Sequence, residues 1–73
     1  MNQPKFVHPK EITKQIIAFL KKNGSKNVQK RMAEKNGDDF CASYIQENIK
    51  QHGVTMNQAL GWLEQDLMEI YNN

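Results

Sequence analysis

Few side chains in this sequence have the types and spacing that catalysis or metal binding requires. Cys41 is the one thiol, and no histidine lies near it in the sequence. His8 and His52 have no Cys, His or acidic partner at a metal-ligand spacing, so no metal site is predicted. Cys41 falls on the apolar face of a predicted helix, together with Phe40, Tyr44, Ile45 and Ile49, and we therefore expect a buried structural thiol. A reactive thiol is the alternative, because the first turn of a helix lowers a thiol pKa.

Two adjacent carboxylates, Asp38 and Asp39, could in principle hold a cation. They stand directly before an apolar helical pattern, where a negative charge favours the start of a helix, so we interpret them as helix-capping residues. The sequence also contains no glycine-rich phosphate loop and no serine elbow. We expect no catalytic residue, no cofactor and no enzymatic activity.

The elements that carry these residues are all predicted to be helices. Glycine follows a polar residue at positions 24, 37 and 53, and each glycine precedes residues that can cap a helix: Ser25, Asp38 or Asp39, and Thr55. The pattern predicts an all-α fold, a small compact bundle of four short helices at about 9–23, 25–36, 39–52 and 55–71. Residues 1–8 are predicted to form a flexible N-terminal arm that precedes a single helical domain, residues 9–73.

The last helix has the clearest apolar pattern. Thr55 and Gln58 match a capping box, and Val54 can pack onto Ala59. The apolar positions that follow advance by four and three residues in turn: Met56, Leu60, Leu63, Leu67 and Ile70. We expect this seam to form the inner face of the bundle, and a homodimer through the same seam is the alternative. The helix at 25–36 is the weakest, because its apolar residues are only Val28, Met32 and Ala33.

Composition limits the class of protein. The chain has 73 residues, of which 38% are hydrophobic and 25% are charged, and one cysteine cannot form an internal disulfide. The longest apolar run, residues 16–20, is too short for a membrane span, so we expect no membrane partner and a cytoplasmic location. A domain of this length has a thin core, which favours a binding module over an enzyme with a deep pocket.

Charge is segregated along the chain. Residues 1–36 contain nine basic and two acidic residues, whereas residues 37–73 contain one basic and six acidic residues. One interpretation is that the two halves neutralise each other, with lysines compensating Glu64, Asp66 and Glu69 near the end of the last helix. The other is that the basic face docks phosphate or an acidic partner. Lys26 and Lys30 favour the second, because like charges four residues apart repel each other in a helix.

The predicted partner- or nucleic-acid-binding residues form one basic cluster: Lys21, Lys22, Lys26, Lys30, Arg31 and Lys35. Lysine gives salt-sensitive affinity for nucleic acid without sequence readout, and Arg31 is the one arginine in the chain. Trp62 lies beside the seam of the last helix and is a candidate anchor for a protein interface.

One stretch resembles a known class of protein. The residues Ile16, Leu20, Gly24, Val28, Met32, Ala33 and Gly37, followed by a third helix, resemble the opening of helix-turn-helix DNA-binding regulators. Ala33 and Gly37 have the spacing of the small residue and glycine that allow two helices to cross closely. The sequence departs from the pattern at Asp38 and Asp39, which would place two carboxylates near DNA phosphates.

These observations predict a small non-enzymatic regulatory or adaptor protein that binds another macromolecule. A protein partner, bound through the basic helical face, is the main hypothesis, and a helix-turn-helix-type DNA-binding transcription regulator is the alternative. The short length and the abundance of lysine and asparagine are typical of accessory proteins of phages or mobile elements.

Overall fold

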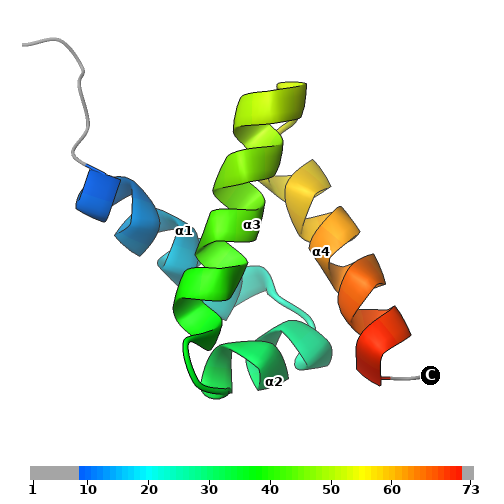
Figure 1. The fold of residues 1–73 in the computed structure, drawn as a ribbon. Coiled ribbons are helices and arrows are strands. Elements are labelled where there is room, and N and C mark those ends of the chain that lie inside the picture. Colours follow the sequence, from blue (N-terminus) through cyan, green and yellow to red (C-terminus); the bar gives the residue numbers. More distant parts are fainter. Residues whose placement is uncertain (1–8, 72–73) are drawn as a thin grey trace, which may run out of the picture.

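Four helices follow one another along the chain and are joined by turns of two to three residues. The computed structural model describes residues 9–71, and the predicted arm at 1–8 lies outside the described residues. The helices are α1 (Pro9–Asn23), α2 (Lys26–Ala33), α3 (Gly37–His52) and α4 (Met56–Tyr71), as Figure 1 shows. The described residues contain no strand, and the prediction of a small all-α bundle of four helices is confirmed.

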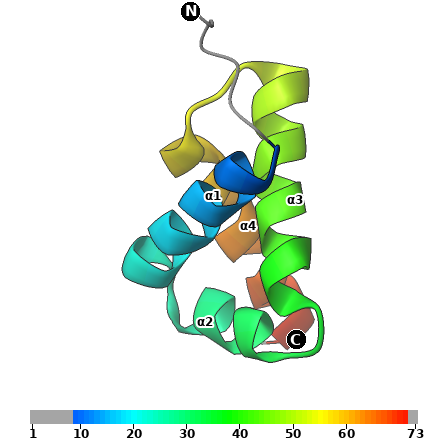
Figure 2. The ribbon, with the colours of Figure 1, turned by 90° about the vertical axis from the view of Figure 1, so that its left-hand side faces the viewer.

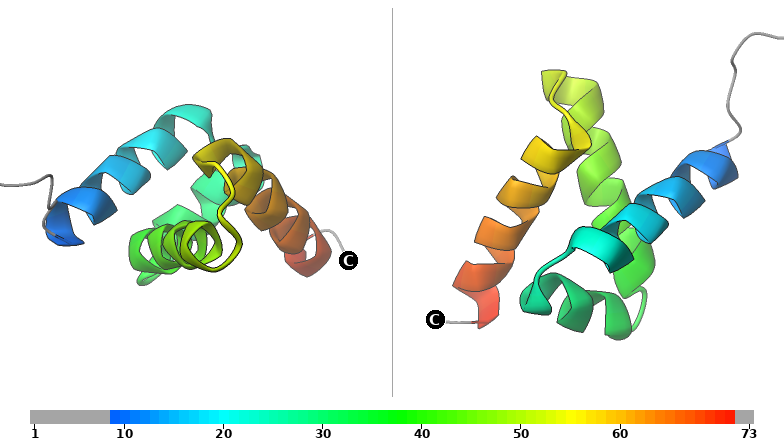
Figure 3. Two further views of the ribbon diagram at one scale, coloured as in Figure 1. Left: turned by 90° about the horizontal axis from the view of Figure 1, so that it is seen from above. Right: turned by 180° about the vertical axis from the view of Figure 1, so that it is seen from behind.

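Helix α3 is the centre of the arrangement, because it packs against each of the other three helices. Helices α1 and α4 lie on either side of it, which is clearest in the view from above (Figure 3, left). Helix α2 passes below, near the N-terminal end of α3, and also contacts α4 (Figure 1). Seen from the side of α1, α4 lies behind α1 and α2 closes the lower end (Figure 2). Helices α3 and α4 meet at their connecting turn and diverge toward α2 (Figure 3, right).

All four helices contribute to one hydrophobic core. Its buried side chains are Ile16, Leu20, Val28, Met32, Cys41, Ala42, Ile45, Ala59, Leu60, Leu63 and Leu67. Most of the seam predicted on the last helix is therefore buried, but Ile70 is 64% exposed. The physical reason is the divergence of α3 from α4, which leaves the Ile70 side of the last turn uncovered, although Tyr71 in the same turn contacts Lys30 of α2. Phe40, predicted on the apolar face of the third helix, is likewise 40% exposed.

The helix ends confirm several predicted caps. The Ser25 hydroxyl accepts a hydrogen bond from the Val28 amide at 3.4 Å and begins α2. The predicted capping box of α4 is formed, because Thr55 and Gln58 each donate a backbone N–H to the side chain of the other at 3.1 Å. Gly53 ends α3 in the left-handed conformation, with φ of 65°.

The C-terminal end of α1 is capped from α2. The side-chain amide of Gln29 donates hydrogen bonds to the carbonyl oxygens of Leu20 at 3.0 Å and Lys21 at 3.1 Å. The Leu20 carbonyl also accepts the Gly24 amide at 2.7 Å, whereas the Lys21 carbonyl is among the last of α1, which have no partner inside their own helix. Gln29 thus ties α2 to α1 through an uncharged group.

The turn between α2 and α3 differs from the prediction. Asn36 adopts the left-handed conformation, with φ of 59°, and is the N-cap of α3, whereas Asp38 and Asp39 lie inside its first turn. Gly37 is the first residue of α3 and is buried. A Cβ at this position would lie 1.8 Å from the carbonyl oxygen of Arg31, so glycine is required by the close approach of two backbones. The expectation that Asp38 or Asp39 is the cap was therefore wrong, although both carboxylates remain at the favourable end of the helix dipole.

Helix α2 is also shorter than the predicted range 25–36. It ends at Ala33, and the amide of Glu34 turns back to the carbonyl of Arg31 at 3.1 Å. The short turn that follows brings Gly37 directly against the last residues of α2. Because only Val28 and Met32 of α2 are buried, this helix depends on contacts from its neighbours.

Candidate functional site

The six predicted basic residues lie at the end of α1, along α2 and in the turn that follows. Five of them are exposed and Arg31 is half-buried. Their positions are Lys21 and Lys22 on α1, Lys26, Lys30 and Arg31 on α2, and Lys35 in the turn. The charge segregation of the sequence thus becomes a segregation by helix, with an excess of basic residues on α1 and α2 and an excess of acidic residues on α3 and α4.

Two of these six cations are engaged with aromatic rings inside the fold. The Lys30 ammonium lies 4.4 Å from the centre of the Tyr71 ring, and the Arg31 guanidinium lies 4.3 Å from the centre of the Phe40 ring. Arg31 also forms an ion pair with Glu34 at 3.5 Å. Each contact between a cation and an aromatic ring contributes about 0.5–1 kcal/mol to stability at an exposed site. They connect α2 to α4 and to α3, so Lys30 and Arg31 have a structural role in addition to any role in binding.

Two of the three acidic residues of α4, Glu64 and Asp66, have partners other than lysine. The Glu64 carboxylate accepts a hydrogen bond from the Ser25 amide at 3.1 Å, at the N-terminal end of α2. This is the positive end of the helix dipole, where an anion is favoured. The Asp66 carboxylate accepts a hydrogen bond from the Tyr44 hydroxyl at 2.6 Å. Glu64 therefore occupies the position on α2 that an external phosphate would otherwise take.

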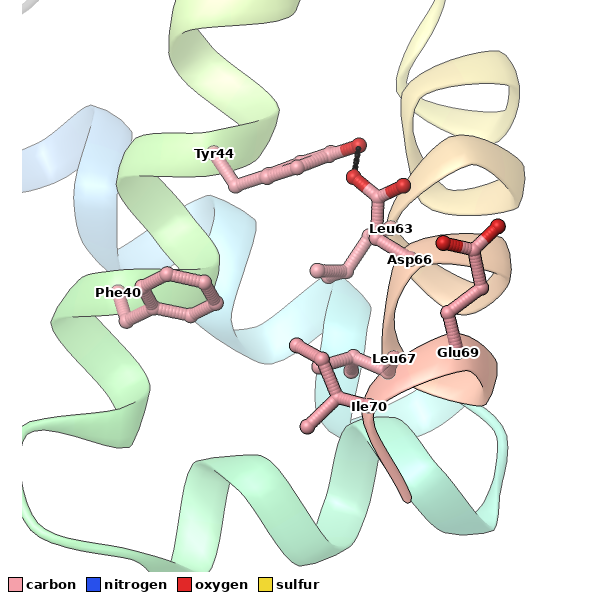
Figure 4. Close-up of a pocket in the computed structure, with 7 residues that line it drawn as sticks. All are labelled: Phe40, Tyr44, Leu63, Asp66, Leu67, Glu69 and Ile70. Atoms are coloured by element: carbon pink, nitrogen blue, oxygen red, sulfur yellow. Dashed lines mark hydrogen bonds between the residues drawn. The ribbon is translucent and has the colours of Figure 1, made fainter. Parts of the chain in front are cut away.

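A groove between α3 and α4 is the second candidate surface. We call it the α3–α4 groove, and it has a volume of about 420 Å³. Figure 4 shows the side chains that line it: Phe40 and Tyr44 from α3, and Leu63, Asp66, Leu67, Glu69 and Ile70 from α4. It lies where the two helices diverge.

The α3–α4 groove combines an apolar floor with exposed apolar walls. Leu63 and Leu67 are fully buried and form the floor. Phe40 from α3 and Ile70 from α4 approach each other from opposite sides in Figure 4, and both remain exposed. The hydrogen bond from Tyr44 to Asp66 spans the space between the two helices above them. This arrangement can accept an apolar side chain and place a charged group of the same partner near a carboxylate.

The phenol of Tyr44 gives a prediction for pH dependence. Desolvation, followed by the hydrogen bond to Asp66 and the charge of Asp66, raises the pKa of Tyr44 from 10.0 to about 12. A group with a raised pKa in the folded state contributes stability that is complete below pH 10 and is lost as the pH rises to about 12. We expect Tyr44→Phe to flatten this part of the stability profile. Urea unfolding of both chains, below pH 10 and between pH 10 and about 12, measures the effect. An equal loss of stability in both chains over that window would contradict the prediction.

Trp62, Asp66 and Ile70 follow one another at intervals of four residues along α4, so they lie on the same side of that helix. Its ring contacts the ring of His52 edge-on, with centroids 5.6 Å apart and an interplanar angle of 85°. The last residue of α3 thus covers part of Trp62, and 40% of the residue stays exposed. Trp62 is not among the residues that line the α3–α4 groove, and it lies nearer the turn at Gly53.

Phe40 and Ile70 are the residues that the sequence did not single out. Their spacing placed both on predicted core-facing stripes, and periodicity cannot report how far two helices diverge.

By contrast, the prediction that Cys41 is buried is confirmed. The thiol is buried, and burial raises its pKa against the opposing effect of Arg31. Within residues 9–71, no group of three or more His, Cys, Asp or Glu is placed to hold a metal ion.

A second groove, of about 400 Å³, lies between α1 and α3, and Ile12, Ile49 and Met56 supply its apolar surface. Lys50 is the one charged residue in its lining, so this groove offers fewer charged groups that could orient a partner than the α3–α4 groove does.

Over the part of the chain that the structure describes, no helix combines the length and apolarity needed to cross a bilayer. Comparison of the chain with protein-family models, with curated proteins and with solved structures found no match.

Proposed function

We propose that this chain is a non-enzymatic regulatory or adaptor protein that acts in the cytoplasm by binding another protein, and that the α3–α4 groove is its docking surface. The observation that carries the proposal is the pair Phe40 and Ile70. These two large apolar side chains stay exposed on opposite walls of one groove, above a buried leucine floor. Exposed apolar side chains that gather in a recess, with charged groups beside them, are typical of protein interfaces.

The basic cluster contributes to this proposal in a different way from the sequence-based expectation. Lys30 and Arg31 contact Tyr71 and Phe40, and Glu64 holds the N-terminal end of α2. The exposed Lys21, Lys22 and Lys26 remain available to attract an acidic region of a partner at long range. We assign affinity to the groove and orientation of the approaching partner to these lysines.

Nucleic acid is the second candidate, and a specific observation favours it. Helices α2 and α3 cross at Gly37 with the close approach that the helix-turn-helix resemblance implies, and Lys21, Lys22 and Lys26 are exposed on the last turn of α1 and at the start of α2. The first turn of α3 carries Asp38 and Asp39, which repel phosphate. The contact with DNA would therefore be made by the lysines and would depend steeply on salt.

Site-specific cross-linking tests the main proposal. A photoreactive amino acid at position 40, in the full chain expressed in its native cells, is expected to give a discrete covalent adduct with a protein. The same amino acid at position 18, an exposed site on α1, is the matched control and is expected to give none. The adduct should be lost when Ile70→Ser is added, because this change removes the opposite wall of the groove.

Two outcomes would contradict the proposal. One is equal cross-linking from positions 40 and 18. The other is binding of duplex DNA that falls steeply with salt and is lost in the triple variant Lys21→Glu, Lys22→Glu, Lys26→Glu, with no protein adduct from position 40. These three lysines suit the test because their side chains are exposed. Changes at Lys30 or Arg31 would also remove packing against Tyr71 or Phe40.

A further inference from the structure

The charge around the α3–α4 groove identifies the kind of partner that it fits. We propose that the groove binds a cationic amphipathic helix of a partner protein. One apolar side chain of that helix sits between Phe40 and Ile70, and its lysine or arginine residues face Asp66 and Glu69. This inference rests on the proposed function and goes one step beyond it, because it specifies the charge and the secondary structure of the ligand.

The rim of the groove is acidic. Asp66 and Glu69 line it from α4, and Glu47 lies on α3 one turn beyond Tyr44. Asp66 and Glu47 take part in hydrogen bonds with neutral donors, which leave their negative charges uncompensated. Two cations of α2 lie at the end of the groove nearest that helix: Arg31 contacts Phe40 and is paired with Glu34, and Lys30 lies over the ring of Tyr71. Neither forms an ion pair with Asp66, Glu69 or Glu47 among the described residues. A negative rim around an apolar recess selects a partner that offers both cations and apolar side chains.

The hydrogen bond from Tyr44 leaves Asp66 able to bind a further donor. It uses Oδ2 of the carboxylate, and an ionised carboxylate has acceptor capacity on both oxygens. The phenol also holds the carboxylate on the groove side of α4, as Figure 4 shows. Asp66 is therefore fixed in position before a partner arrives, which lowers the entropic cost of pairing with a lysine or arginine.

The shape of the groove favours a helix over an extended peptide. Both walls are helices whose backbone N–H and C=O groups are bonded within the helix, so recognition must use side chains rather than strand addition. From Trp62 to Ile70 the exposed surface of α4 advances eight residues, about 12 Å, which matches about two turns of a docked helix. Apolar residues at positions i, i+4 and i+7 of the partner would cover that length.

Two synthetic peptides of equal length test the charge requirement. Both carry leucine at i, i+4 and i+7, and they differ only in flanking residues, which are lysine in one and glutamate in the other. Titration into the full chain, followed through the fluorescence of Trp62, the one tryptophan, gives both affinities. We expect the lysine peptide to bind at least about tenfold more tightly, and its affinity to fall as salt is added.

Matched variants on α4 test the location. Ile70→Ser is expected to weaken binding of the lysine peptide about tenfold. Met68→Ser is the control, because Met68 is 53% exposed but lies on the opposite side of α4, and it is expected to leave the affinity unchanged. Glu69→Lys should weaken the lysine peptide and strengthen the glutamate peptide, which a merely structural role of Glu69 would not produce.

The possible failures are distinct. Equal or tighter binding of the glutamate peptide, still weakened by Ile70→Ser, would overturn the cationic partner and leave the groove as a docking surface. Equal effects of Met68→Ser and Ile70→Ser would overturn the location. Self-association in sedimentation experiments that Ile70→Ser abolishes would make a second copy the occupant and also overturn the inference. Failure of the proposed function itself would appear separately, as the absence of a protein adduct from position 40.

Discussion

Replacing Gly37 with alanine is expected to lower the free energy of unfolding by at least about 3 kcal/mol. The added methyl group would lie 1.8 Å from the carbonyl oxygen of Arg31 and 2.8 Å from the carbonyl carbons of Arg31 and Met32. All three are backbone atoms, so no side chain can rotate away to make room. Helix α2 would have to move off the start of α3, and Val28 and Met32 would move with it. A core of this size supplies no more than about 5 kcal/mol, so the variant should be mostly unfolded or close to it.

Gly61→Ala is the matched control for this substitution. Gly61 lies inside α4 with nothing within 4 Å of an added Cβ. Alanine has the higher helix propensity, so the free energy of unfolding should rise by about 0.5–1 kcal/mol. Urea unfolding followed by circular dichroism measures both changes. A Gly37→Ala chain with the unfolding midpoint of the parent would contradict the close approach of α2 to α3 at Gly37.

Ile45→Ala is expected to be the second most damaging change, with a loss of about 2–5 kcal/mol. Ile45 is fully buried at the centre of α3, the helix that contacts all the others. Truncation removes apolar contacts and leaves a cavity that four rigid helices cannot collapse to fill. The midpoint of urea unfolding reports the loss.

Ile70→Ala provides the comparison for Ile45. The same atoms are removed, but Ile70 is 64% exposed, so the expected loss is below about 0.5 kcal/mol. Similar losses at the two positions would mean that the core is not centred on α3. A small loss at Ile70 would also show that Ile70→Ser can be used in binding experiments without unfolding the chain.

Local sequence signals predicted most of the fold. The spacing of apolar residues marked all four helices, and Ser25 and the Thr55–Gln58 pair marked the starts of two of them. These signals act within one turn of helix, so they can be read directly from the sequence. The turn at Asn36-Gly37 could not be read in the same way. Glycine there meets a need for space between two helices, which the helix-turn-helix resemblance implied but no signal within one turn of helix shows, and Asn36 adopts the left-handed conformation.

The candidate site was harder to predict for a related reason. Phe40 and Ile70 have the spacing of core residues, and only the divergence of α3 from α4 leaves them exposed. The basic cluster was visible in the sequence, but the rings that receive Lys30 and Arg31 come from distant positions, Tyr71 and Phe40. Contacts between helices decide both features, and a single sequence contains no direct record of them. The role of the remaining lysines stays a prediction.

The cap that Gln29 provides has an electrical consequence. A neutral amide satisfies the end of α1, so the ammonium groups of Lys21 and Lys22 are not needed for that purpose. The molecule therefore keeps a permanent separation of charge between its first two helices and its last two. A protein with this separation of charge turns in the electric field of a charged partner before the two make contact. The association rate should therefore depend on ionic strength far more than the lifetime of the complex does.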